Sequence, residues 1–160
     1  MGTEADPSDE WLELFNPTSY SIHLADWTLR SVTGAAPDPI ITLDKTISAF
    51  GFLLLERSND STISDTLADV IYTGALNNSG ERLELRNAEG RLVDIVDASN
   101  GWYAGTNTPK ASMERVDPRK PGTDVASWAS HNNSRQSGTD QKGNPIRGTP
   151  RSLNSVALPR

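Results

Sequence analysis

The chain has 160 residues, with 21 acidic and 15 basic side chains, a net charge of −6 and no cysteine. The length suits one domain with a single buried core. The missing thiols exclude a disulfide framework, a thiolate zinc site and a cysteine nucleophile. No apolar run approaches the 18 residues of a membrane-spanning helix.

The first predicted strand covers residues 10–16. Its side chains alternate, with Leu12 and Leu14 on one face and Trp11 and Phe15 on the other. Because both faces carry apolar side chains, we expect this strand to lie inside a sheet rather than at its edge. The sequence Asn-Pro-Thr-Ser then ends it, since Pro cannot donate to a ladder and Asn and Ser favour turns.

Alternation resumes over residues 21–31, with a local bend at residues 25–26. Trp27 and Leu29 share one face beyond the bend, and His23 points away from its apolar neighbours toward solvent. Both segments therefore read as scaffold strands.

Three further apolar runs predict strands at residues 40–43, 49–57 and 70–74. The run at 49–57 is the most apolar, so we expect it to be central. Residues 58–69 are polar and read as a long loop.

A β-hairpin over residues 81–97 gives the clearest local signal. Leu83 and Leu85 alternate with charged side chains before the turn Asn-Ala-Glu-Gly at residues 87–90. Four loop residues ending in Gly suit a type I turn followed by a left-handed residue, a conformation that Gly adopts at little cost.

Beyond the hairpin the pattern weakens, with a loop at residues 99–110, one short strand at 111–117 and an extended polar segment at 131–160. About eight to nine short strands and no long amphipathic helix predict an all-β fold, a β-sandwich. We expect a single domain over residues 1–160, with its core at about 9–130 and the irregular C-terminal segment packed on it.

Several segments stand in a characteristic order: EWLELFNPTS, DWTLR, ISAFGFLLLER, GALNNSGERLELRNAEGRLVD, SMERVDP, ASWAS and GNPIRGTPRSLNSV. In this order they resemble the lamin tail domain, and most closely its bacterial versions in secreted and cell-surface proteins. The resemblance implies an immunoglobulin-like sandwich of two antiparallel sheets, with no catalysis and no cofactor. It also implies a tethering or recognition role at the bacterial surface or outside the cell.

The chain departs from that pattern at its start. Family members usually carry an apolar strand ahead of the segment GTEADPSDEW, whereas Met1 stands directly before it here. A missing strand would expose a sheet edge, and such an edge invites pairing with another chain. We therefore expect a domain cut out of a larger protein and open to edge-strand self-association.

The chain has two histidines, His23 and His131, and both are candidate catalytic bases. Neither lies near a G-x-S-x-G turn, and no H-E-x-x-H occurs. We predict no enzyme, although a Ser-His-Asp arrangement assembles only in space. It would require a cleft in which one of these histidines reaches a carboxylate and a hydroxyl.

Asp60, Asp65 and Asp69 are the candidate calcium ligands. Their spacing lacks the 1-3-5 pattern and the Gly of a calcium loop, so we favour turn capping in a solvated loop. Asp94 and Asp97 form a weaker second candidate, and we expect Asp94 to bond a neighbouring strand or turn instead. No metal or cofactor is predicted.

Trp102 and Tyr103 lie between two glycines in a loop and are the candidate ligand-facing aromatics, suited to stacking on a sugar. The alternative is a plug over one end of the sandwich. Trp11 with Phe15 is the next candidate, against burial in the core.

Charge is distributed unevenly, with a net −11 over residues 1–109 and +5 over residues 110–160. Arg115, Arg119 and Lys120 form a candidate basic patch. One interpretation of this asymmetry is an interaction tail. We favour the other, in which the basic C-terminal part lies against the acidic part or is solvated. The overall acidity opposes general nucleic-acid binding.

These observations predict a non-catalytic interaction module that binds a protein or a cell-surface component. The alternative is an accessory domain that binds nucleic acid or polysaccharide for an attached hydrolase.

Overall fold

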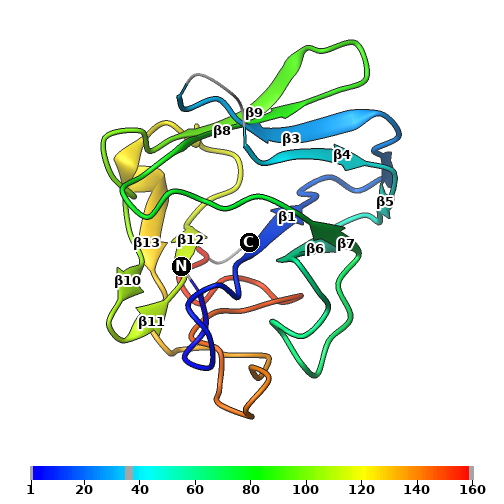
Figure 1. Cartoon of the computed structure of the whole chain (residues 1–160). Coiled ribbons are helices and arrows are strands. Elements are labelled where there is room, and N and C mark those ends of the chain that lie inside the picture. The colour runs from blue at the N-terminus through cyan, green and yellow to red at the C-terminus, as the bar shows by residue number, and fades with distance from the viewer. Residues whose placement is uncertain (1, 35–37, 159–160) are drawn as a thin grey trace.

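A computed structural model describes residues 2–34 and 38–158 (Figure 1). The described residues form thirteen short strands and one 3-10 turn at Val125–Ser127, with no α-helix. The prediction of an all-β fold with a sandwich-like layering of antiparallel sheets is confirmed. The strands outnumber the eight or nine expected, because six of the thirteen have only two or three residues and lie in three small pairs outside the two larger sheets.

The larger sheet is antiparallel throughout and has the order β4-β3-β8-β9. Its strands are β3 (Trp27–Ser31), β4 (Ile40–Leu43), β8 (Arg82–Arg86) and β9 (Leu92–Asp97). The predicted hairpin joins β8 to β9, and Gly90 has the expected left-handed φ of 75°. Leu29 and Leu83 are buried on the inner face of this sheet.

The second sheet has the order β1-β6-β7. Its strands are β1 (Trp11–Phe15), β6 (Phe52–Arg57) and β7 (Val70–Tyr72). As predicted, β6 is central, but β7 pairs with it in parallel. The reason is the intervening loop at residues 58–69, because parallel neighbours need a crossover of about a dozen residues rather than a tight turn.

The interior position predicted for β1 is wrong, since β1 lies at the edge of its sheet. Its apolar side chains on both faces have another cause. Leu12 and Leu14 pack on the main core between the sheets, whereas Trp11 packs on a second cluster of Leu54, Ile63 and Ile146. The sheet is therefore covered on both faces, although β1 itself has a strand on one side only.

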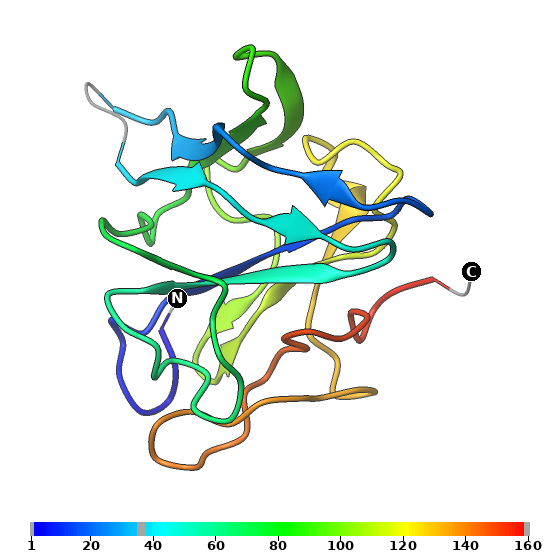
Figure 2. The same ribbon diagram turned by 90° about the vertical axis from the view of Figure 1, so that its right-hand side faces the viewer.

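The C-terminal segment provides the second cover. Figure 2 shows it, orange to red, passing below the β1-β6-β7 sheet on the side away from the larger sheet. It is irregular, with one isolated bridge between Thr139 and Pro145. Asp140 fixes its loop to the N-terminal segment, because its carboxylate accepts the N–H groups of Ala5 (2.9 Å) and Asn144 (2.9 Å).

The remaining strands form three small pairs: β2 (Ile22–His23) with β5 (Thr46–Ile47), β10 (Thr106–Asn107) with β11 (Lys110–Ala111), and β12 (Met113–Arg115) with β13 (Trp128–Ser130). The last strand was not predicted, because three residues after a 3-10 turn are too few to show alternation.

Candidate functional site

A groove of about 960 Å³ opens along the outer edge of β1. Residues 11–17 line one wall without a gap, and residues 110–121 line the other. A sheet face would present only every second residue, so these unbroken runs indicate walls made of strand and loop edges rather than of a sheet face. The floor reaches apolar side chains of the main core, including Leu29, Leu83 and Leu85.

The wall formed by β1 carries backbone groups that turn toward the groove. Arg57 N–H donates to Glu10 O (2.9 Å) and Asn16 N–H donates to Gly51 O (3.0 Å), which fixes the even-numbered residues as those bonded to β6. The N–H and C=O groups of Trp11 and Glu13 therefore face outward. Within the described ranges, no backbone group bonds to them on that side.

The opposite wall has a similar edge on β12. The bonds His131 N–H to Ser112 O (3.0 Å) and Val116 N–H to Ser127 O (2.9 Å) set its register with β13. Alternation turns the N–H and C=O of Met113 toward the groove. Among the residues that the structure describes, Met113 has no backbone partner there. β1 and β12 thus line the groove from two sides, and the open part of the β12 edge is Met113, because the C=O of Arg115 accepts from Asn154 Nδ2 (2.9 Å).

The groove also explains why part of the core is only half-buried. Leu12, Leu14, Trp27, Leu85 and Val96 all pack against the main cluster yet keep partial exposure. All five line the groove. Their remaining exposure is apolar surface that a bound group could cover.

Glu13 lies on the β1 wall, and its Oε1 accepts the N–H of Arg151 (2.7 Å). Burial raises the pKa of Glu13 to about 8, against the opposing effect of Arg151 and with added repulsion from Asp69 and Glu114. The carboxyl is therefore mostly protonated at neutral pH, so the wall is uncharged at this position.

The aromatic pair predicted to face a ligand is anchored in the fold. Trp102 Nε1 donates to Asn77 O (2.9 Å), and its ring packs on the main core and lines the groove. The Tyr103 hydroxyl donates to Asp97 O and lies 3.3 Å from Thr123 O. Both side chains are half-buried rather than set on an open shelf.

The candidate basic patch lines the groove, but two of its three members are paired. Arg115 binds both oxygens of Asp94 and lies over the Trp128 ring at 5.3 Å, so Asp94 bonds a neighbour as expected. Arg119 binds Asp117 (2.9 Å). Lys120 is exposed.

The three candidate calcium ligands each cap a different segment. Asp60 accepts the N–H of Ala68 (2.7 Å), and Asp65 accepts the N–H of Thr139 (3.1 Å). Asp69 accepts the N–H of Leu54 (2.8 Å) and also pairs with an arginine of the C-terminal segment. In the described part of the chain, no three His, Cys, Asp or Glu side chains are arranged to hold a metal ion.

The two histidines differ in burial and in hydrogen-bond partners. His23 is exposed, as predicted, and its Nδ1 lies 2.8 Å from Thr46 Oγ1. His131 is buried, with its Nδ1 3.0 Å from Glu114 Oε1. The hydroxyl of Ser155 donates to the other oxygen of Glu114 (2.6 Å) and not to the imidazole. This arrangement ties the C-terminal segment to β12.

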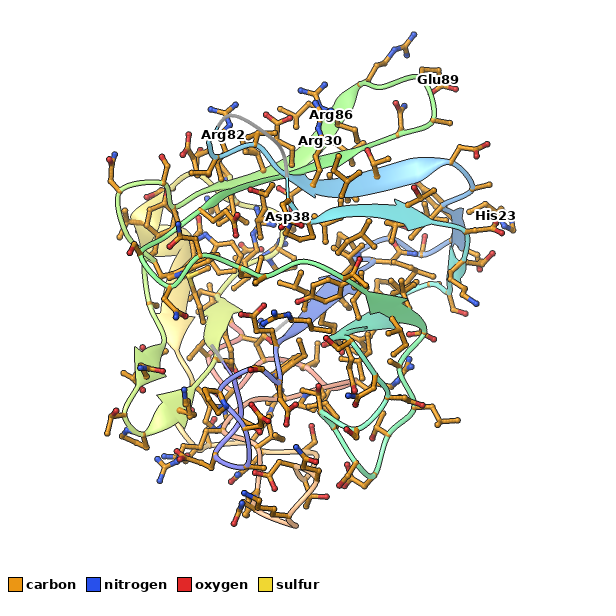
Figure 3. All side chains as sticks on the ribbon, in the orientation of Figure 1. His23, Arg30, Asp38, Arg82, Arg86 and Glu89 are labelled. Carbon is orange, nitrogen blue, oxygen red and sulfur yellow. The ribbon has the colours of Figure 1, made fainter. Side chains whose placement is uncertain are left out.

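A cluster of arginines on the larger sheet was not singled out from the sequence. Figure 3 shows Arg30, Arg82 and Arg86 side by side on its outer face, where they surround the buried Glu84. Burial raises the pKa of Glu84, but hydrogen bonds from Arg86 and Arg82 outweigh it, so the pKa lies below its usual value. This carboxylate neutralises part of the arginine charge.

No protein-family model matches the sequence, and no curated protein matches it either. Across the described residues, no helix is long and apolar enough to span a bilayer. The departure from the lamin tail pattern at the start of the chain predicted an open edge, but it did not predict that β12 lies across the groove from β1, since the two strands are about one hundred residues apart in the sequence.

Proposed function

We propose that the protein is a non-catalytic binding module that holds a partner in the groove between β1 and β12. One observation carries the proposal: a groove of about 960 Å³ is lined by the edges of β1 and β12 and by half-buried core side chains. Covering such apolar surface drives association. The groove needs no chemical step to perform this role.

The sequence resemblance supplies the setting of this proposal. Bacterial lamin tail domains with an immunoglobulin-like sandwich belong to secreted and cell-surface proteins, where they tether or recognise. The all-β layers of this chain are compatible with that family. We therefore propose a tethering module of a bacterial extracellular or surface protein, with a protein or surface component as its partner.

The charges favour a protein partner over nucleic acid or polysaccharide. Arg115 and Arg119 are engaged by carboxylates of the same chain, which reduces their attraction for phosphate. Trp102 is held against the core by its indole hydrogen bond, so its ring is not set out as a stacking platform. What remains open in the groove is backbone and apolar side chains.

Phage display of random twelve-residue peptides on the immobilised protein tests this function. Selected peptides are then measured by fluorescence polarisation against Met113→Arg and Ala157→Arg, which place a charged side chain in the groove lining. The matched control is Leu67→Arg, because Leu67 is 76% exposed and lies outside the groove.

We expect selected peptides to bind the wild type and Leu67→Arg equally, and each groove variant at least tenfold more weakly. Circular dichroism and thermal unfolding check that each variant folds, and two groove positions guard against a folding defect at one. Peptides that bind all four proteins equally, or no selected peptides at all, would refute the proposed function.

A further inference from the structure

We propose that the partner is an extended segment of another polypeptide, which enters the groove as one β-strand and bonds to β1 and β12 at the same time. This inference rests on the proposed function and names its ligand. The inserted strand would join the β1-β6-β7 and β12-β13 pairs into one continuous sheet.

The direction of the two walls supports a single bridging strand. Residues 147–151 contact both walls in ascending order: on the β12 wall, Ser112 N–H donates to Arg147 O and the Thr149 hydroxyl donates to Glu114. On β1, Gly148 lies against Trp11 and Arg151 N–H donates to Glu13. Residue numbers therefore increase in the same direction along both walls. One strand that runs opposite to β1 is also opposite to β12, so both new ladders would be antiparallel, the more stable pairing.

The backbone groups on the two walls match the two sides of such a strand. Successive residues of a strand direct their N–H and C=O groups to opposite sides. Every second residue of the inserted segment would therefore bond to Trp11 and Glu13 on β1, and the residues between them to Met113 on β12. No side-chain ligand satisfies both edges in this way.

The C-terminal segment already contacts both walls at one end of the groove. Arg147 O accepts the N–H of Ser112 (2.9 Å), and Gly148 lies so close to Trp11 that an added Cβ would come within 2.7 Å of its indole. The segment thus bonds to the β12 wall and packs on the side chain of Trp11, so a backbone comes close to both walls here. Figures 1 and 2 show β1 and β12 near one another in both views.

The lining specifies the side chains of the inserted strand. Residues bonded to β12 share the face of Met113, opposite that of Glu114, and would point toward the half-buried Leu14 and Leu85 of the floor. They should be aliphatic. The alternate residues would face the C-terminal segment near Ile146 and the protonated Glu13. They should be uncharged, because Arg115 and Arg119 of the lining already have carboxylate partners.

Alternate N-methylation of a synthetic peptide tests the bridge. The probe has Val or Ile at every second position, Thr between them and Lys at both ends, and a fluorescent label for polarisation. One methylated version blocks the N–H groups of the aliphatic positions, which would face β12, and the other blocks those of the Thr positions, which would face β1. A slip by one residue would bury Thr in the floor, so the pattern fixes the register.

We expect each methylated version to bind at least tenfold more weakly than the unmodified peptide, and methylation of a terminal Lys to have no effect. Weakening by one set alone would show addition to a single edge and overturn the bridge. If neither set weakens a peptide that Met113→Arg and Ala157→Arg block, the inference fails while the proposed function stands.

Two other results would also overturn the inference, and a third would refute the proposed function as well. If this probe does not bind, but selected peptides without alternating aliphatic residues do bind in the groove, the inserted strand is refuted and the proposed groove-binding function stands. Sedimentation of the protein alone as a dimer that the peptide dissociates would identify a second copy as the occupant. Failure of every peptide to bind would refute the proposed function itself.

Discussion

Asn16 shows how one buried amide organises a turn. It is 1% exposed, and its Nδ2 donates to the carbonyl oxygens of Tyr20 (2.8 Å), Ile47 (3.2 Å) and Ser48 (3.0 Å). Its Oδ1 accepts both the N–H and the hydroxyl of Thr18. The turn itself was predictable from Asn-Pro-Thr-Ser, but the contacts to residues 31 and 32 positions away were not, since they depend on the fold.

Replacing Asn16 should therefore be costly. We expect Asn16→Ala to lower the free energy of unfolding by about 3 kcal/mol or more, because buried carbonyl groups lose their donor. Asn16→Asp keeps the acceptor for Thr18 but turns a carboxylate oxygen toward three carbonyls, so it should be at least as destabilising at neutral pH. Urea unfolding measures both. A loss below 1 kcal/mol for either variant would contradict this role.

Tyr72 differs from Asn16, because its polar group is buried without a hydrogen-bond partner in the described ranges. Its side chain is buried in the main core, and its hydroxyl has no hydrogen-bond partner among the described residues. Burial, with the nearby Glu10, raises its pKa. Because an unsatisfied buried hydroxyl is unfavourable, we expect Tyr72→Phe to leave the free energy of unfolding unchanged or raise it by up to about 1 kcal/mol. A loss beyond 1 kcal/mol in thermal or urea unfolding would show that the hydroxyl has a partner.

Among the secondary-structure elements, the alternation of apolar and polar side chains predicted where strands lie, but not which strands are neighbours in a sheet. Residues 10–16, 40–43 and 81–97 form the strands expected of them, because period-two patterning reports on each strand's own faces. The same pattern says nothing about sheet edges. β1 has apolar side chains on both faces because the C-terminal segment covers its outer face, not because it has two neighbouring strands.

Glu114 links β12 to that covering segment. Its Oε1 lies within 3.2 Å of the hydroxyls of Ser112 and Thr149 and 3.0 Å from His131 Nδ1, and its Oε2 accepts the N–H and hydroxyl of Ser155. A carboxylate accepts at both oxygens, whereas an amide places two donors at one of them. Hence Glu114→Gln should turn donors toward donors.

We expect Glu114→Gln to destabilise the protein by about 2–3 kcal/mol and to release the C-terminal segment first. Limited proteolysis followed by mass spectrometry should show faster cleavage within residues 132–158 than in the wild type. His131→Phe keeps an aromatic ring, although a larger one, and removes only the contact to Glu114 Oε1, so it should release the C-terminal segment less than Glu114→Gln does. Equal cleavage in Glu114→Gln and wild type would contradict the link.

Over the whole molecule, the opposite charges of the two parts of the sequence meet in space. Arg151 pairs with Asp69 (2.8 Å) and Arg115 with Asp94, so the basic C-terminal part does lie against the acidic part. Composition predicted this tendency and the all-β class. It could not predict the groove, which results from where residues 110–121 cross the edge of β1, a matter of tertiary packing rather than of any local pattern.

The same packing buries carboxyl groups, and this should make stability depend on pH. Burial raises the pKa of Glu13 to about 8 and that of Glu56 to about 7, from an ordinary value of 4.5. Between 4.5 and these values the folded protein binds more protons than the unfolded chain, so stability must fall as pH rises. The pKa of Asp140 is lowered: burial opposes the shift, but hydrogen bonds from Asn144 and other donors outweigh it. Its contribution is present above about pH 4 and is lost on further acidification.

We therefore expect maximal free energy of unfolding near pH 5 and a decline toward pH 8, measured by urea unfolding at constant ionic strength. Glu13→Gln removes one titrating group while keeping an oxygen for the N–H of Arg151, so it should reduce that decline by about 2 kcal/mol after allowance for solvent screening. Glu89→Gln is the matched control, because this exposed side chain lies at the tip of the β8-β9 hairpin (Figure 3). A decline equally steep in Glu13→Gln and Glu89→Gln would mean that solvent reaches Glu13 through the groove well enough to keep its carboxylate ionised.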